Sequence, residues 1–147
     1  MPSHTDRLLL AVVQVAGSSR ACARQGDAAM FDALQAYYVL ASDAVRVAGG
    51  RFVKPIGDAV LLTFPLDRAK DAVLALQDLQ ARGTDLWRRF DIHCAVQVRL
   101  GAGPVQCGPL GPPGEERFDI VGDALNTLFK APAGDFYVSP EVTPFLT

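Results

Sequence analysis

The chain has 147 residues, half of them apolar, which suits one domain with a single buried core. Its formal net charge is −2, so it lacks the overall positive charge that draws proteins to nucleic acid or to anionic membranes. Its three cysteines lack the paired spacing of a disulfide framework, so we expect a cytoplasmic protein without disulfides. Its longest apolar run, residues 8–13, is too short to cross a bilayer. We therefore expect one domain over residues 1–147 that has no nucleic-acid or membrane partner.

The first half of the chain predicts a strand, a helix, a hairpin and a second helix. A continuous run of branched apolar residues from Leu8 to Val15 is typical of a strand buried on both faces. Helical spacing of apolar residues predicts a helix from Ala28 to Val47. After an apolar hairpin over residues 49–64, the same spacing predicts a helix from Asp67 to Arg82 that Gly83 ends.

The second half predicts a further hairpin and shorter elements. Strict alternation indicates a half-buried strand from Asp91 to Leu100, and Gly101-Ala102-Gly103 is expected to turn the chain into a partner strand. A helix at Val121–Lys130, a strand at Phe136–Val138 and a closing helix follow. This order predicts the α+β class, with a mostly antiparallel sheet and helices on one face. The other face of such a sheet is left for a partner chain.

The first hairpin carries two charges at a turn that needs neither. Lys54 and Asp58 lie four residues apart in GGRFVKPIGDAVLLTF, residues 49–64. Alone, Asp58 is an ordinary turn residue and Lys54 a solvated charge at a strand end. Three further segments stand in order around the hairpin: LLLAVVQVAGSS (8–19), VRLGAGPVQCGPLG (98–111) and RFDIVGDALNTLFK (117–130). Together the four segments resemble the catalytic domain of class III nucleotidyl cyclases, the adenylate and guanylate cyclase family, over residues 7 to 146.

The resemblance implies a ferredoxin-like-based class III cyclase fold, dimers with active sites in the interface, and conversion of ATP to cyclic AMP and pyrophosphate. In the family, two aspartates hold two divalent metals, Mg or Mn. Asp58 matches one aspartate, whereas Gln14 stands at the other position. A neutral amide is a poor bridging ligand for magnesium, so we do not expect tight binding of two ions, and an inactive chain would need none. Judged by its place alone, Gln14 is a strand-end amide that bonds to nearby backbone.

The resemblance also assigns four residues to the nucleotide. Lys54 and Asp119 match the pair that reads adenine in adenylate cyclases, so ATP is the implied nucleoside triphosphate. Asn126 and Lys130 share one face of the short helix as an i, i+4 pair. Asn126 matches the residue that orients the ribose, but Lys130 replaces an arginine that stabilises the transition-state phosphate and lacks its planar fork. Alone, Asp119 and Lys130 are charges that suit the two ends of a helix.

Gly17-Ser18-Ser19 follows the first strand, where backbone N–H groups and hydroxyls could cradle a polyphosphate, although three small residues are common in any loop. The sequence therefore favours an adenylate cyclase-like signalling domain with a degenerate metal site, weak or inactive as a homodimer because of Gln14 and Lys130. Two alternatives stay open. One is a pseudoenzyme that serves as a non-catalytic nucleotide-binding or dimerisation module, and the other is the base-reading half of a heterodimer with another cyclase-like chain.

Overall fold

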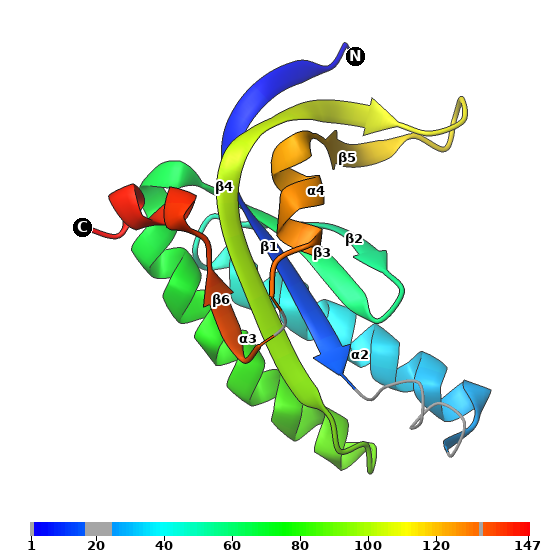
Figure 1. The fold of residues 1–147 in the computed structure, drawn as a ribbon. Coiled ribbons are helices and arrows are strands. Elements are labelled where there is room, and N and C mark those ends of the chain that lie inside the picture. The colour runs from blue at the N-terminus through cyan, green and yellow to red at the C-terminus, as the bar shows by residue number, and fades with distance from the viewer. Residues whose placement is uncertain (1, 17–24, 133) are drawn as a thin grey trace.

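The computed structural model describes residues 2–16, 25–132 and 134–147. These residues form a six-stranded sheet in the order β2-β3-β1-β4-β5, with β6 pairing with β4 (Figure 1). The strands are β1 (His4–Ala16), β2 (Arg51–Ile56), β3 (Ala59–Pro65), β4 (Ala95–Leu110), β5 (Arg117–Val121) and β6 (Phe136–Val138). The helices are α2 (Asp27–Arg46), α3 (Ala69–Arg89) and α4 (Asp123–Phe129), with 3-10 turns η1 (Leu66–Arg68) and η2 (Pro140–Phe145). Among the strand pairings of these described residues, only that between β4 and β6 is parallel, which confirms the predicted α+β class.

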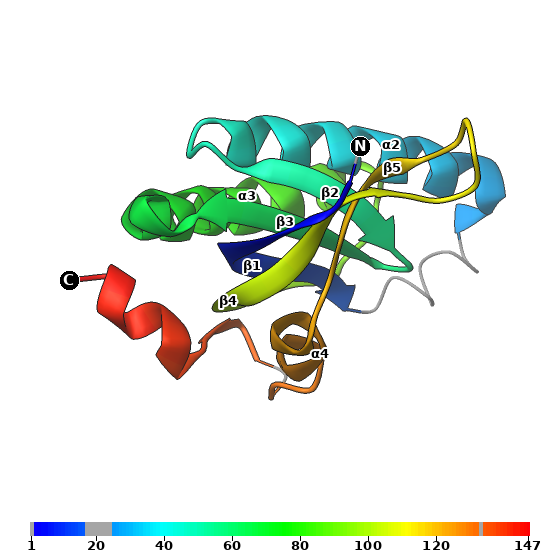
Figure 2. The ribbon, with the colours of Figure 1, turned by 90° about the horizontal axis from the view of Figure 1, so that it is seen from above.

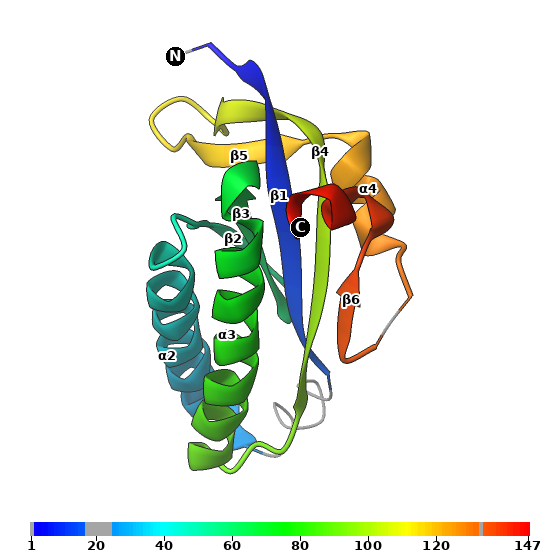
Figure 3. The same cartoon turned by 90° about the vertical axis from the view of Figure 1, so that its left-hand side faces the viewer.

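The central strand β1 explains the continuous apolar run of the sequence. It pairs with β3 on one side and β4 on the other, and both of its faces are covered. Leu9, Ala11 and Val13 face the two long helices, whereas Leu10 and Val12 belong to a second cluster on the opposite face. Figure 3 shows α2 and α3 side by side over one face of the sheet. None of the described helices combines the length and apolarity needed to cross a membrane.

The short helix α4 lies on the other side of the sheet from the long helices (Figure 2). Its buried residues Leu125 and Leu128 join Leu10, Val12 and Ile120 in the second cluster. The sequence predicted helices on one face of the sheet and a partner chain over the other face. The two long helices follow that arrangement, and α4 covers part of the face that was left open.

The prediction of a turn at residues 101–103 is wrong. Strand β4 runs unbroken through these residues and pairs with β1 from Ala95 to Cys107. A Cβ added at Gly103 would lie only 2.6 Å from the Cβ of Ala124 on α4, and one added at Gly101 would lie 3.1 Å from Leu128. The glycines therefore let α4 approach the strand closely. The hairpin instead turns after Leu110 and returns as β5.

The helix end predicted at Gly83 is also wrong, because α3 continues to Arg89. Gly83 is buried, and a Cβ there would lie 3.1 Å from the ring of Tyr37 on α2. The glycine thus permits close packing of the two long helices rather than a helix stop. At the other end, Asp67 lies in η1 and makes no capping hydrogen bond, and the closing helix is the 3-10 turn η2.

Candidate functional site

Lys54 and Asp119, which lie 65 residues apart in sequence, are in direct contact. The Lys54 Nζ donates to Asp119 Oδ2 at 2.7 Å, and Asp119 Oδ1 accepts the Ile120 N–H at 2.8 Å. The two side chains are 36% and 15% exposed. The contact is therefore a partly buried ion pair that joins β2 to β5.

A bulge in β2 sets the direction of Lys54. Phe52 pairs with Leu62 and Lys54 with Leu61, so the register shifts by one residue at Val53. Phe52 packs among the helix-facing residues, with its ring 5.8 Å from that of Tyr38. Leu61 belongs to the cluster on the opposite face. The bulge thus turns the Lys54 ammonium to the face that the long helices do not cover.

A second contact, which the sequence analysis missed, joins the same two strands. The Arg51 guanidinium carbon lies 3.9 Å from the centre of the Phe118 ring, a cation–π arrangement. Arg51 stands three positions before Lys54, and Phe118 directly precedes Asp119. Nothing in the spacing could have identified this pair before β2 and β5 were known to be neighbours.

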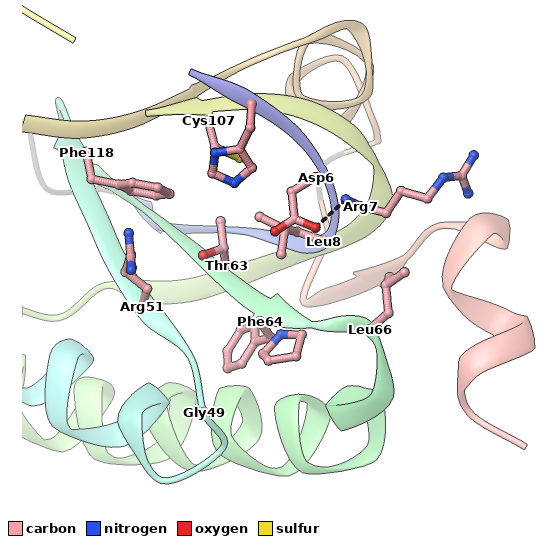
Figure 4. Close-up of a pocket in the computed structure, with 12 residues that line it drawn as sticks. Asp6, Arg7, Leu8, Gly49, Arg51, Thr63, Phe64, Leu66, Cys107 and Phe118 are labelled. Atoms are coloured by element: carbon pink, nitrogen blue, oxygen red, sulfur yellow. Dashed lines mark hydrogen bonds between the residues drawn. The ribbon is translucent and has the colours of Figure 1, made fainter. Parts of the chain in front are cut away.

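A pocket of about 380 Å³ lies beside this contact. Figure 4 shows Arg51 and Phe118 at one end of it and the Asp6 carboxylate at the other. Cys107 also lines the pocket, and burial, with a smaller effect of Asp6, raises the pKa of its thiol, although Arg51 opposes the shift. This shift disfavours the thiolate, which is the reactive form of a cysteine. The two opposite charges suit a ligand group that both donates and accepts hydrogen bonds.

Gln14 and Asp58, at the two metal positions that the resemblance implied, are brought together. Gln14 lies near the end of β1, opposite Ala59, and Asp58 follows Gly57 in the β2–β3 turn. The Val15 N–H donates to the Asp58 carbonyl at 3.0 Å and fixes the turn against the strand end. The Gln14 Nε2 then donates to Asp58 Oδ1 at 3.4 Å, so the amide contacts the carboxylate rather than the backbone expected from its place alone.

The side chains of Gln14 and Asp58 do not fit as ligands of a pair of divalent ions. Two such ions need carboxylates to balance their charge, and this site offers the Asp58 carboxylate and an amide whose N–H points at it. Within residues 2–16, 25–132 and 134–147, no group of three His, Cys, Asp or Glu side chains could hold a metal. The predicted phosphate loop, Gly17-Ser18-Ser19, lies outside the described residues.

Asn126 and Lys130 lie exposed on and just after α4. The Asn126 N–H donates to the Gly122 carbonyl at 3.2 Å, and the Lys130 N–H donates to the Thr127 carbonyl at 3.1 Å, which closes the helix. Their side chains reach solvent on the same side of the sheet as α4. The fold thus brings together two of the three expected pairs of site residues through the sheet, whereas the third, Asn126 and Lys130, is exposed at α4.

Known structures share this fold over nearly the whole chain. The catalytic core of a rhodopsin-guanylyl cyclase with converted specificity, in complex with ATPalphaS, matches with a TM-score of 0.86 and 20% identity, covering 100% of this chain and 85% of that one. The adenylyl cyclase CyaB from P. aeruginosa matches with a TM-score of 0.83 and 20% identity, over 99% and 83% of the two chains. A bacterial light-regulated adenylyl cyclase matches with a TM-score of 0.84 and 15% identity. The present chain spans about half of it, 47% of its length.

No family model matches the sequence, and no curated protein matches it. The likeness therefore lies in the fold, at sequence identities of 15–20% for these three structures. The chain has the fold of adenylyl and guanylyl cyclase catalytic domains, as the four sequence segments had indicated.

Proposed function

We propose that this chain, which has the fold of the class III nucleotidyl cyclase catalytic domain, binds a nucleoside triphosphate with ATP favoured and is weak or inactive as a homodimeric cyclase. The single observation that carries the proposal is the contact between the Gln14 amide and the Asp58 carboxylate, at a position where the resemblance calls for two carboxylates. The two cysteines in the part of the chain that the structure describes, Cys94 and Cys107, are unpaired, which favours a reducing compartment such as the cytoplasm.

The preference for ATP rests on the Lys54–Asp119 pair. An ammonium that donates to N1 of adenine and a carboxylate that accepts from its amino group complement adenine, whereas guanine presents the opposite pattern. Solved neighbours with this fold include one in complex with ATPalphaS and a guanylate cyclase domain in complex with GTP. The fold therefore accommodates both bases, and the choice must come from side chains such as this pair.

The weakness of the proposed cyclase rests on charge. Replacing one of two carboxylates by an amide removes a full negative charge from the place where two dications and a triphosphate would meet, and at short range such a charge is worth several kcal/mol. Mg or Mn would supply charge neutralisation and activation of the 3′-hydroxyl if the protein were active. Asp58 remains able to contribute one ligand to such an ion.

Lys130 weakens the phosphate side in the same direction. A lysine keeps one positive charge near the transferring phosphate but makes single, flexible contacts, whereas an arginine can grip two oxygens at once. Together with Gln14, it leaves recognition residues intact and transition-state residues reduced. This combination supports nucleotide binding with little turnover.

A second candidate is the base-reading half of a heterodimer. It is favoured by the residues that the chain keeps: Lys54, Asp119 and Asn126 are present, whereas Gln14 replaces a metal carboxylate, which is the pattern expected of a chain that supplies the base-reading side. A different cyclase-like chain that carries both metal aspartates could complete the site across the interface. Mixing with such a chain should then raise activity, and it would leave the activity unchanged if the homodimer were the functional form.

Cyclic AMP production from ATP with Mn or Mg tests the proposal. We expect little product from the wild type and at least a tenfold rise in the double variant Gln14→Asp/Lys130→Arg, which restores the carboxylate and the planar fork. Asp58→Ala in that background should abolish the gain, and Asp85→Ala, at an exposed position of α3, should not. Rapid turnover by the wild type that Asp58→Ala abolishes would refute the assignment of Gln14.

A further inference from the structure

A second cavity lies behind α4, between this helix and strand β4. It has a volume of about 340 Å³. Its floor is the small-residue segment Gly101–Pro104 of β4, one wall is α4, and the other wall is formed by β6 and the start of η2. Figure 3 shows α4 beside β4, the C-terminal turn passing in front of β4, and β6 below α4. None of these lining residues belongs to the Lys54–Asp119 or Gln14–Asp58 pairs.

The floor of this cavity, named here the α4 cavity, is a stretch of β4 that lacks a strand on one edge. Strand β6 pairs with β4 only as far as Leu100, and β5 begins to pair at Gln106. The Ser139 N–H donates to the Leu100 carbonyl at 2.9 Å, so the backbone groups of Leu100 point to this edge. Because these directions alternate along a strand, the N–H and C=O of Ala102 point the same way, into the gap. This edge presents one donor and one acceptor side by side.

A buried hydroxyl adds a third polar group. Ser139 is 8% exposed, and its Oγ has no hydrogen-bond partner among the described residues. A Cβ added at Gly101 would lie 3.6 Å from this Oγ, so the hydroxyl faces the glycine floor. A buried hydroxyl without a partner is costly, and a ligand group that satisfies it is correspondingly favoured. The exposed carboxylate of Glu141 also lines the cavity and disfavours anions there.

The α4 cavity is mechanically close to the nucleotide residues. Ala124, Thr127 and Leu128 line it, while Asn126 and Lys130 lie about 100° and about 60° around the helix axis from Thr127. Since β4 and α4 pack closely at Gly101 and Gly103, the helix cannot move closer to the strand there. A molecule that fills the cavity therefore contacts the helix that carries Asn126 and that Lys130 caps.

We propose that the α4 cavity is a regulatory site for a small neutral molecule with an amide or lactam edge. The amide group pairs with the N–H and C=O of Ala102, its remaining hydrogen-bonding capacity meets the Ser139 hydroxyl, and the apolar part packs on Leu128 and Ala131. Binding repositions α4. The regulatory part rests on the proposed function, because it acts through Asn126 and Lys130, whereas the binding part does not depend on it.

Titration of the full, 15N-labelled chain with benzamide, followed by 1H–15N NMR, tests both parts without nucleotide. Saturable shifts are expected at Gly101, Ala102, Gly103 and Ser139, accompanied by shifts at Asn126 and Lys130. Benzoate, an anion of the same shape, should cause none, because it cannot donate to the Ala102 carbonyl and because the Glu141 carboxylate repels it.

Two variants and a control complete the test. Ser139→Ala, which removes a hydroxyl without a described partner, should weaken benzamide binding about three- to tenfold. Ala131→Leu should abolish it by filling the cavity, and Ser42→Ala on α2 should leave it unchanged. Absent shifts, equal binding of benzoate, or wild-type affinity in Ala131→Leu would overturn the site. Shifts confined to the floor, without any at Asn126 and Lys130, would overturn its coupling to α4. A chain that binds no ATP but shows the expected shifts would refute the proposed function alone.

Discussion

Breaking the Lys54–Asp119 pair should cost both stability and nucleotide affinity. An exposed ion pair contributes about 0.2–1 kcal/mol, and breaking a fully buried one costs about 3–5 kcal/mol. With side chains 36% and 15% exposed, this pair lies between the two cases. We expect Lys54→Met to lower the free energy of unfolding by about 1–2 kcal/mol, because it leaves a carboxylate that is 85% buried with the Ile120 N–H as its described partner.

The same substitution should weaken binding of an unreactive ATP analogue about 10- to 100-fold, the value of one charge-assisted hydrogen bond. Urea unfolding measures the first quantity and titration calorimetry the second. Lys70→Met, at an exposed position of α3, is the matched control and should change neither. A variant that is destabilised yet binds the analogue as tightly as the wild type would show that the pair only ties β2 to β5, and the reasoning on the base would fail.

Two further predictions concern the fold. Gly103→Ala should lower the free energy of unfolding by about 1–3 kcal/mol, since its Cβ would lie 2.6 Å from that of Ala124. Gly134→Ala is the control and should leave the free energy of unfolding unchanged, because its Cβ would meet no atom within 4 Å. Equal urea midpoints of the two variants would contradict the close approach of α4. Burial raises the pKa of Tyr37 above its ordinary value of 10.0, so the unfolded chain loses this proton first and stability should fall by about 1.4 kcal/mol per pH unit above pH 10. In Tyr37→Phe this fall should be smaller, and an unchanged slope in urea titrations between pH 9 and 11 would contradict it.

The central strand and the buried face of α3 could be predicted because burial leaves a direct trace in the sequence: the apolar run of β1 follows from cover on both faces. The buried face of α2 could not be predicted in the same way, because Phe31, which the helical spacing places inward, is 73% exposed, while Met30, Ala33 and Tyr37 are buried. The structural roles of three glycines could not be predicted in this way. Gly83, Gly101 and Gly103 all look like stops or turns, yet each marks a close approach of another element, which depends on residues far away in the sequence.

The candidate site shows the same division. The spacing of Lys54 and Asp58 within one hairpin marked the region, and the order of the four segments indicated the fold. The contacts of Gln14 with Asp58 and of Arg51 with Phe118 depend on which strands are neighbours and on a bulge at Val53. Neither the neighbours nor the bulge has a signature in a single sequence.

The most direct test of the account is the number of Mn²⁺ ions bound per chain in the presence of an unreactive ATP analogue, measured by calorimetry or electron paramagnetic resonance. We expect binding of the second ion to require a carboxylate at position 14. The wild type should therefore bind one ion at most, and Gln14→Asp should bind two. Two tightly bound ions per wild-type chain would contradict the claim that an amide beside Asp58 leaves a nucleotide pocket without a working metal pair.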